Sequence, residues 1–353
     1  MIASLTVAPS AICVTESNYP SPIRNTSNLY AHGAPCAYAE LRITMPEVQL
    51  RMMHLKDWPE VAELIYLSTN YWYQTHGMSA IFQGGPEVAL VFCEEYEALD
   101  PGCCILAVQP DTDRIIGSCF YHPRPTHLSL GIMNAHPNYG GMGIAKRLLQ
   151  YIIAQAEEQN LSIRLVSSAM NLDSYSLYTR AGFVPQAMYQ DMYLPNPDLQ
   201  RLASMPHTDR VREAVMDDLP AIVSLEQELH HIYREKDYRH FLSNASGIWH
   251  MSIYENESGN IDGFLTSVTH PGSNMLGPGV MRTEDLALAL IASELQHHPD
   301  RTPVFLIPVT CRTLIGNLYA LGARNCELHV HQVRGPYQPG SGILMPSFMP
   351  ETC

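Results

Sequence analysis

Residues 134–149, NAHPNYGGMGIAKRLL, contain the pattern that decides the fold of this chain. The stretch ends a run that predicts a β-strand, turns through Gly140, Gly141 and Gly143, and continues as an amphipathic helix. Glycines in such a turn let the backbone approach a ligand closely and let several N–H groups point toward the positive end of the helix dipole. A strand, a glycine turn and a helix in this order are typical of a diphosphate site. Many glycine turns bind nothing, so the function of this one depends on its context.

Length and composition predict a globular protein with two domains of ordinary size. The chain has 353 residues, of which 46% are hydrophobic and 16% are charged. Its formal net charge is −14. This charge argues against partners that need a basic face, so we expect no nucleic acid and no membrane as partner. It is compatible with a cationic or amine-bearing substrate.

The nine cysteines do not form a metal-binding pattern. None belongs to a CxxC pair or to a Cys/His cluster with zinc spacing, so we expect no metal. We interpret the cysteines as buried or free thiols in a reducing compartment. The sequence shows no apolar run of membrane-spanning length and no signal-peptide pattern, so we expect a cytoplasmic protein.

Hydrophobic periodicity and turn residues predict a mixed α/β plan that occurs twice. Strands are expected at 48–53, 103–109, 115–121, 128–135, 163–168 and 188–194, and in the second half at 211–214, 248–254, 261–268, 304–309 and 326–333. Helices are expected at 57–75, 86–99, 144–160 and 173–180, and in the second half from 217 and at 236–242, 283–296 and 312–321. The two halves also open alike, with MMHLKDWPEVAELI in the first and REAVMDDLPAIVSL in the second.

This repeat predicts a division of the chain into five parts. Residues 1–45 are a leader, partly disordered or lying as a strap, and residues 46–195 are the catalytic domain. Residues 196–209 are a linker rich in proline and polar residues. Residues 210–334 form a degenerate copy of the first domain, and residues 335–353 are a C-terminal tail. The tail contains two short apolar runs and is expected to fold back as a lid or a strand touching the other domain.

Two motifs resemble those of the GNAT family of acyl-CoA-dependent N-acetyltransferases. The family signature Gln/Arg-x-x-Gly-x-Gly/Ala corresponds to residues 138–143, although Asn138 replaces the usual Gln or Arg. The second motif pairs an asparagine with a later Tyr-x-x-x-Gly-Phe, here Asn171 and residues 178–183. The resemblance implies two GNAT-like acyltransferase domains in tandem, with mixed α/β sheets. In that fold the fourth and fifth strands separate, and the pantetheine arm of acyl-CoA fits between them.

The resemblance also implies the residues that hold acetyl-CoA or another acyl-CoA. The pantetheine arm would pair with the fourth strand, and the pyrophosphate would lie on the N–H groups of the glycine turn. The expected cofactor-binding residues are Met133, Asn134, Ala135, Asn138, Tyr139, Gly140, Gly141, Met142, Gly143, Ile144, Ala145 and Asn171. For Asn171 the alternative is a capping role in the local turn.

The family assigns Tyr178 as the general acid that protonates the leaving thiolate, and its alternative is a packing role. The general base is left open, because the fourth strand carries no carboxylate where many family members have one. His127 and His122 titrate near neutral pH and are our candidates; Glu94 and Glu95 are weaker ones. If the amine arrives neutral, no base is needed.

The second half differs from the first at its equivalent turn. The glycine pattern is missing, and Glu284 and Asp285 fall in the first helical turn, where they would repel a phosphate. We therefore expect this copy to have lost its cofactor site. Farther along, Glu327, His329 and His331 share one strand face. We interpret that strand as solvated or substrate-facing, with a metal site as the less favoured alternative.

The leading functional hypothesis is direct transfer of an acetyl or short acyl group from acyl-CoA to a primary amine of a small molecule or peptide. The alternatives are a non-catalytic module for acyl-CoA binding, sensing or assembly, and an enzyme that uses a hydroxyl acceptor or a longer acyl chain. We expect a monomer or a homodimer. The sequence does not identify the acceptor.

Overall fold

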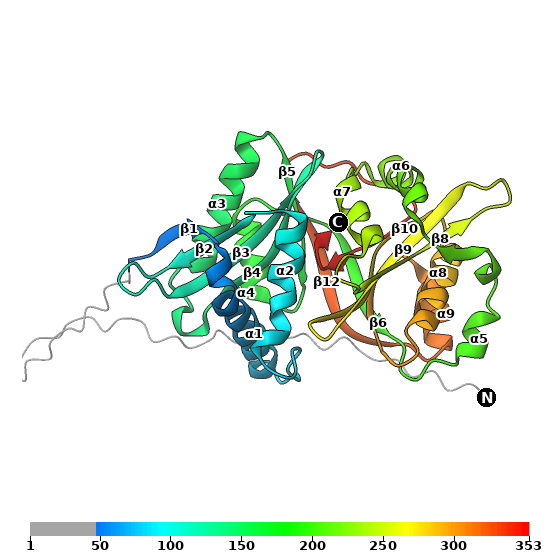
Figure 1. Cartoon of the computed structure of the whole chain (residues 1–353), viewed down its shortest axis with the longest axis horizontal. Helices are drawn as coiled ribbons and strands as arrows, with labels where there is room; N and C mark the ends of the chain where they lie inside the picture. The colour runs from blue at the N-terminus through cyan, green and yellow to red at the C-terminus, as the bar shows by residue number, and fades with distance from the viewer. Residues whose placement is uncertain (1–46, 353) are drawn as a thin grey trace, which may run out of the picture. The chain divides into compact units, whose positions relative to one another are not determined.

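The computed structural model describes residues 47–352, which fall within one compact unit (Figure 1). The leader predicted at 1–45 lies outside the described residues. Within residues 47–352, no helix combines the length and the apolar character needed to cross a membrane.

The first half contains six strands and four helices in the described residues. They are β1 (Gln49–Met52), α1 (Trp58–Thr75), α2 (Leu90–Leu99), β2 (Cys104–Val108), β3 (Ile115–Pro123), β4 (His127–Ala135), α3 (Ile144–Glu158), β5 (Ser162–Ser168), α4 (Leu172–Arg180) and β6 (Val184–Tyr193). Helix α3 forms because Ile144, Leu148 and Ile152 recur at helical spacing and are all buried. Helix α4 ends before Gly182, whose φ of +88° suits the residue after a helix.

The second half repeats this order of elements after the short helix α5 (Leu199–Ala203). They are β7 (Val211–Glu213), α6 (Leu219–His230), α7 (Glu235–Ser243), β8 (Trp249–Glu255), β9 (Ile261–His270), β10 (Ser273–Met281), α8 (Glu284–His297), β11 (Val304–Pro308), α9 (Arg312–Ala320) and β12 (Arg324–Arg334). The tail adds β13 (Ile343–Met345), β14 (Ser347–Phe348) and β15 (Glu351–Thr352).

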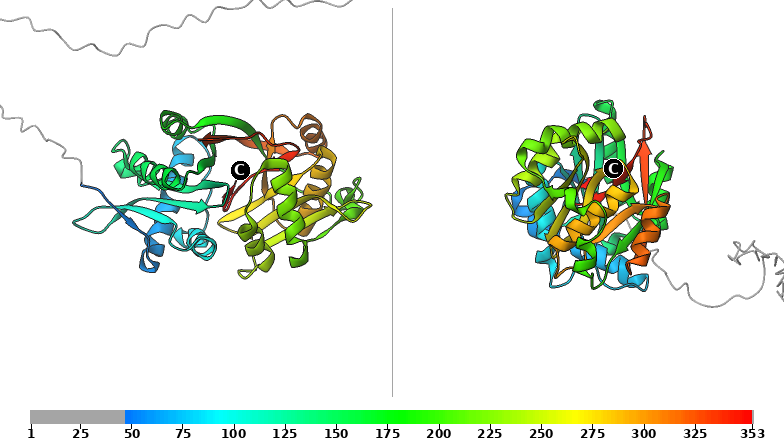
Figure 2. Two further views of the ribbon diagram at one scale, coloured as in Figure 1. Left: turned by 90° about the horizontal axis from the view of Figure 1, so that it is seen from above. Right: turned by 90° about the vertical axis from the view of Figure 1, so that its right-hand side faces the viewer.

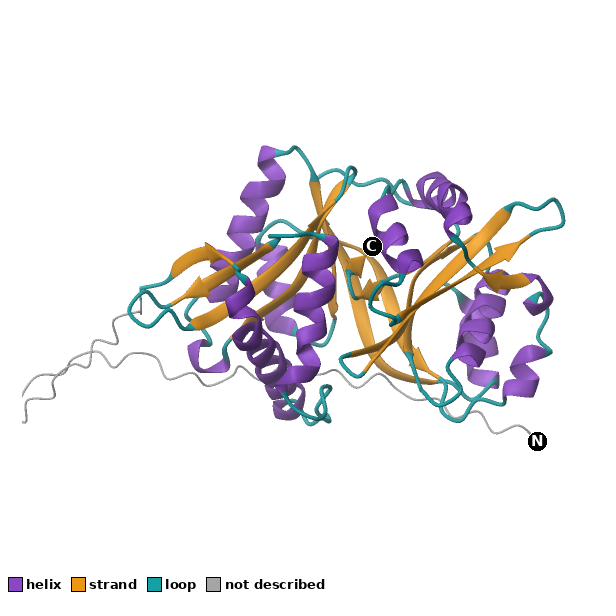
Figure 3. Cartoon of the chain, viewed as in Figure 1, coloured by secondary structure: helices purple, strands orange, loops and turns teal. Residues whose placement is uncertain are grey.

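One mixed sheet runs through both halves (Figure 3). Its order is β1-β2-β3-β4-β5-β12-β6-β11-β10-β9-β8-β7, with β13 beside β10. The last strand of each half therefore lies in the sheet of the other half. β12 pairs antiparallel with β5 and β6, and β6 pairs antiparallel with β11. Figure 1 shows these two long strands between the halves.

Helices cover both faces of the first half of the sheet. Leu106 and Phe120 pack with α1 and α2, while the intervening Ile105 and Ile116 pack with α3 on the other face. The core under α1 and α2 continues into the second half, where it includes Ile222 and Phe241. The two halves thus share this hydrophobic cluster, and two further clusters lie on the other face of the sheet, under α3 and under α8.

The tail returns to the sheet and then crosses to the first half. β13 pairs antiparallel with β10 from Gly279 to Met281. β14 and β15 form a two-stranded sheet, and the backbone of β15 lies against β4 and β5. In the left view of Figure 2, part of this red segment lies between the two halves. The predicted return of the tail as a strand is confirmed.

Two elements differ from the sequence prediction. No strand was predicted at 273–281, where β10 lies, and α5 lies inside the segment predicted as a linker. The division into domains at 46–195 and 210–334 stays a proposal. By chain order there are two repeats, but the exchanged strands and the shared core join them into one unit.

Candidate functional site

The strands β4 and β5 separate soon after they begin. They pair in parallel only where residues 127–129 face residues 162–164, although β4 continues to Ala135 and β5 to Ser168. Beyond this short pairing, β5 is paired with β12 on its other side, and β4 with β3. The edge of β4 facing β5 therefore has backbone groups without a strand partner, which an extended ligand can use. We call the space between these strands the gap.

A β-bulge lies in β4 at the gap. Cys119 pairs with Met133 and Tyr121 pairs with Leu130, so Gly131 and Ile132 together oppose the single residue Phe120. A Cβ atom on Gly131 would lie 2.8 Å from the Phe120 carbonyl oxygen, so only glycine fits there. The bulge changes the direction of the β4 backbone groups next to the gap.

The glycine turn follows β4 and leads into α3. Gly141 and Gly143 have φ angles of +76° and +74°, a left-handed conformation that glycine adopts without strain. A Cβ atom at either residue would meet no atom of the described chain within 4 Å. The backbone of the turn is therefore open to a ligand.

The turn presents a group of unpaired N–H donors. The N–H groups of Asn138, Tyr139, Gly140 and Met142 are bonded to atoms inside the turn and are not free. The N–H groups of residues 141, 143, 144 and 145 have no acceptor among residues 47–352. We thus narrow the predicted phosphate donors to these four.

The charges around the turn favour an anionic ligand. The first turn of α3 has no acidic residue and carries the exposed Lys146 and Arg147. Cations at a helix N-terminus are unfavourable unless an anion is bound there. The opposite arrangement occurs in the second half, where α8 begins with Glu284 and Asp285.

The predicted residues Met133, Asn134 and Ala135 form the end of β4 beside the gap. The Asn134 side chain points to α1, where its Nδ2 donates to Ser68 Oγ at 2.8 Å. Of Asn134, therefore, only the backbone is available for the predicted contact with the cofactor. Ile144, the first residue of α3, is buried, and Ala145 is half-buried.

Asn171 and Tyr178 lie on α4, which packs against β5. Asn171 Oδ1 accepts a hydrogen bond from Ser174 N at 3.0 Å, so Asn171 caps α4. Tyr178 is buried with Phe183, their ring centroids 5.7 Å apart, in the core between the sheet and α3. The cap fixes the start of the helix that positions Tyr178.

His127 and His122 lie on the opposite face of the sheet from Tyr178. His127 is buried, with Nδ1 3.0 Å from Thr126 Oγ1 and Nε2 3.1 Å from Ser129 Oγ. Burial, and after it the positive charge of Arg164, lower the pKa of His127 well below its usual value. His122 is buried too, with Nδ1 2.8 Å from Asp100 Oδ2. The structure does not bring either histidine together with Tyr178.

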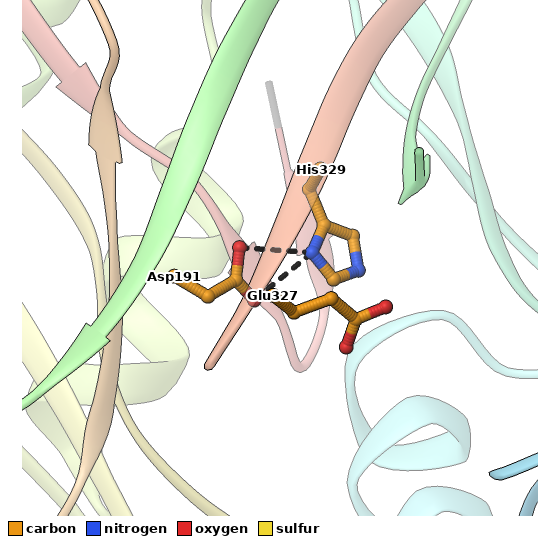
Figure 4. A group of neighbouring side chains, drawn as sticks. All are labelled: Asp191, Glu327 and His329. Atoms are coloured by element: carbon orange, nitrogen blue, oxygen red, sulfur yellow. Dashed lines mark hydrogen bonds and ion pairs between the residues drawn. The ribbon is translucent and has the colours of Figure 1, made fainter. Parts of the chain in front are cut away.

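A cluster that the sequence does not predict lies on that same face. Asp191 of β6 and Glu327 and His329 of β12 are buried side by side (Figure 4). The solvated alternative is wrong for Glu327, His329 and His331, since all three are buried, and the substrate-facing alternative stays a prediction. The two-residue spacing of Glu327, His329 and His331 was the sequence signal that these side chains share a strand face. Nothing in the sequence connected them with Asp191.

In the second half, the equivalent gap is filled. β10 and β11 pair in parallel only at Met275–Val304 and Leu276–Phe305, and then β13 pairs with the continuing β10. Glu284 at the start of α8 accepts a hydrogen bond from Leu314 N through Oε2 at 2.5 Å. In the second half, a strand of the chain itself thus pairs with the edge that has no strand partner in the first half.

Comparisons with known proteins agree with this geometry. The model of the acetyltransferase (GNAT) family matches residues 52–183. A comparison with the curated proteins finds no match.

Several solved structures share the fold over most of the chain. A candidate acetyltransferase from Pyrococcus horikoshii has a TM-score of 0.64 at 15% identity, with 91% of this chain and 98% of that chain covered. A tandem GNAT protein from the clavulanic acid biosynthesis pathway has a TM-score of 0.54 at 15% identity, covering 83% of this chain and 100% of that chain. Saccharomyces cerevisiae N-myristoyltransferase with bound myristoyl-CoA has a TM-score of 0.55 at 10% identity, covering 83% of this chain and 80% of that chain.

The predicted fold is therefore confirmed, and the predicted resemblance to the GNAT family is confirmed for residues 52–183. The family motifs, the separated strands and the glycine turn all lie in the first half, and the second half repeats the fold without an open gap. Residues 52–183 match the model of the GNAT family of acetyltransferases, and the chain as a whole shares its fold with a tandem GNAT protein.

Proposed function

We propose that this protein is an acyl-CoA-dependent N-acyltransferase that transfers an acetyl or short acyl group to a primary amine of a small molecule or peptide. The observation that carries the proposal is the open edge of β4, which leads directly to the unpaired N–H groups of the glycine turn. The match of residues 52–183 to the GNAT family model supports it.

The residues present fit acyl-CoA. The β4 edge at 130–135 offers backbone groups for the amides of the pantetheine arm. The N–H groups of residues 141 and 143–145 would hold the pyrophosphate, with Lys146 and Arg147 beside it. When bound, acyl-CoA supplies an activated thioester.

The proposed roles of the remaining residues follow from the face of the sheet on which each of them lies. A backbone N–H at the β4 bulge would polarise the carbonyl under attack. Tyr178, on the α3 face, would donate a proton to the leaving thiolate through the gap. The acceptor would approach from the α1/α2 face. His127 and His122 lie there and stay candidates for the base, although both ring nitrogens of His127 are already bonded.

A longer acyl chain is the alternative with an observation in its favour. The fold is shared with an N-myristoyltransferase whose structure holds myristoyl-CoA. Acetyl-CoA and myristoyl-CoA offered at equal concentrations separate the two, because the preferred chain length appears as the higher kcat/KM.

Release of free thiol from acetyl-CoA in the presence of a panel of primary amines tests the proposal. Tyr178→Phe should lower kcat with little change in acetyl-CoA affinity. Gly141→Glu should abolish acetyl-CoA binding, because it places a carboxylate against the pyrophosphate. Gly247→Glu is the matched control, since Gly247 has a φ of +72° and open space around it but lies in the second half. Acetyl-CoA binding without transfer to any amine would instead support a binding or sensing module.

A cytoplasmic location and a monomeric or homodimeric state belong to the same proposal. The buried thiols of Cys93 and Cys104 support a reducing compartment. Sedimentation of the purified protein would decide its oligomeric state.

A further inference from the structure

The cluster of Asp191, Glu327 and His329 lies where the exchanged strands meet. Asp191 is directly opposite Glu327 in the antiparallel pairing of β6 with β12, and His329 is two residues farther along β12. The three side chains are 2%, 8% and 6% exposed. Because β6 belongs to the first half and β12 to the second, neither half contains the cluster alone.

The cluster has more negative charge than its partners neutralise. It holds two carboxylates and one imidazole, with His329 Nδ1 2.9 Å from Asp191 Oδ1. Within residues 47–352, neither carboxylate forms an ion pair with a lysine or an arginine. Burial raises the pKa of Asp191 above its usual value despite the opposing effect of His329. Buried charge of one sign is unfavourable unless it is paired, so the cluster is suited to a cation.

Glu327 shows where such a cation would bind. Its Oε2 accepts a hydrogen bond from the Tyr73 hydroxyl at 2.7 Å, but its Oε1 is buried without any hydrogen-bond partner in the described chain. In Figure 4, the Glu327 carboxylate and the Nε2 atom of His329 project to the same side, away from Asp191. An acceptor atom and a ring nitrogen are therefore free on one side of the cluster.

This free side of the cluster lies on the α1/α2 face of the sheet, from which the acceptor would approach. His329 is directly opposite Ser168 of β5, the strand that borders the gap. Tyr73 extends from the end of α1, on the face opposite α3. The Phe348 ring of the tail lies 4.5 Å from the His329 ring, so the tail forms one wall of the cluster.

We propose that Glu327, with His329 and Asp191, forms the subsite that binds an ammonium group of the acceptor beside the gap. This inference rests on the proposed N-acyltransferase function and extends it to acceptors that arrive as cations, whose ammonium group must give one proton to a base, for which His122 and His127 are the candidates, before its nitrogen attacks the thioester. Asp191 is a positioning residue, because it acts by orienting the His329 ring through Nδ1.

A metal ion fits the cluster less well than an ammonium group. His329 Nδ1 is already bonded to Asp191, so only Nε2 and the Glu327 carboxylate face the free side. Zinc sites in proteins generally use at least three protein ligands. An ammonium group needs only hydrogen-bond acceptors, and Glu327 Oε1 is one.

The test uses the full-length protein and three variants. The probes are n-butylamine, 2-phenylethylamine, glucosamine and a lysine-containing tripeptide, each with acetyl-CoA. Glu327→Gln should raise KM for the best amine at least tenfold and leave acetyl-CoA affinity within twofold. Binding of that amine, measured by calorimetry with CoA bound, should weaken by the same factor. Asp191→Asn should lower kcat and change KM less than Glu327→Gln does.

Glu294→Gln is the matched control. Glu294 is also buried against a histidine, but its two oxygens are bonded to His250 and Ser267. Glu294→Gln should lower the melting temperature of the ligand-free protein and leave the amine KM unchanged. Glu327→Gln should keep or raise the melting temperature, because it removes an unneutralised charge without removing the acceptor for Tyr73. This stability measurement does not depend on finding the natural acceptor.

The outcomes separate this inference from the proposed function. Unchanged amine KM and amine binding in Glu327→Gln would overturn the inference and leave the proposed function intact. Loss of amine transfer after dialysis against a chelator, restored by zinc, would overturn it in favour of a metal site. Failure of the wild-type protein to acylate any amine, despite binding acetyl-CoA, would overturn the proposed function and the inference with it.

Discussion

The ion pair between Arg124 and Asp237 offers the sharpest test of how the two halves hold together. Arg124 follows β3 in the first half, and Asp237 lies on α7 in the second. Their side chains are fully buried, and two hydrogen bonds of 2.6 and 3.0 Å join the guanidinium to the carboxylate. Asp237→Asn removes the negative charge and leaves the arginine charge buried between the halves.

The burial and the paired geometry set the expected magnitude. Removing one partner of a buried pair costs about 3–5 kcal/mol, because the remaining charge is uncompensated. Replacing both partners with apolar residues, as in Arg124→Met with Asp237→Leu, should leave the free energy of unfolding much nearer the wild-type value. The double variant still loses the bond from Arg124 Nη1 to the His122 carbonyl, a net loss of about 1 kcal/mol.

Urea unfolding of the wild type, Asp237→Asn, the two single variants Arg124→Met and Asp237→Leu, and the double variant measures these differences. The double variant should be more stable than Asp237→Asn, which is a strongly non-additive result. A loss below about 1 kcal/mol in Asp237→Asn would refute the reasoning, since it would mean that water reaches the buried guanidinium. A double variant as unstable as the sum of the single variants would refute it as well.

Three further predictions follow from the glycine turn, a buried histidine and the tail. Gly143→Ala should reduce the free energy of unfolding by about 1–2 kcal/mol, because φ is +74° while space for the Cβ is open; Gly143→Asn should lose less in the same urea titration. His331 has a pKa lowered to about 3 by burial, so the unfolded chain takes up its proton first as pH falls below about 6.5. Stability should thus fall with pH, by about 2 kcal/mol for this residue at pH 5, and His331→Gln should show a smaller fall by calorimetry. Met345→Ala should cost about 2–5 kcal/mol of unfolding free energy, because its fully buried side chain helps β13 to fill the second gap; an unchanged melting temperature would contradict this.

Most helices and strands could be predicted because their signals are local. The apolar spacing in α3 and the glycine after α4 depend only on residues a few positions apart. β10 was missed because Gly277, Pro278 and Gly279 are typical of a turn. In the structure, Gly279 lies inside the strand, where a Cβ atom would lie 2.6 Å from Leu265 Cδ1 and 3.0 Å from the Phe264 carbonyl oxygen. A close approach between strands leaves no local signal.

The candidate site also contains features with a local sequence signal and features without one. The glycine turn and Tyr178 belong to motifs that are short and contiguous, so sequence reasoning found them. It did not show that four N–H groups of the turn are already bonded, because those bonds depend on how η3 (Pro137–Tyr139) folds before α3. The cluster around Glu327 was missed because Asp191 is more than 130 positions away from Glu327 and His329.

The sequence by itself determined the family, the glycine turn at 138–143 and the loss of that turn in the second half. These features depend on residue types at fixed short spacings, and local physical chemistry dictates them. Only the tertiary structure decided the exchange of β6 and β12, the filling of the second gap by β13 and the assembly of Asp191 with Glu327 and His329. The physical reason is that strand pairing buries backbone groups between segments far apart in the chain, and no local pattern specifies which partner a strand will take.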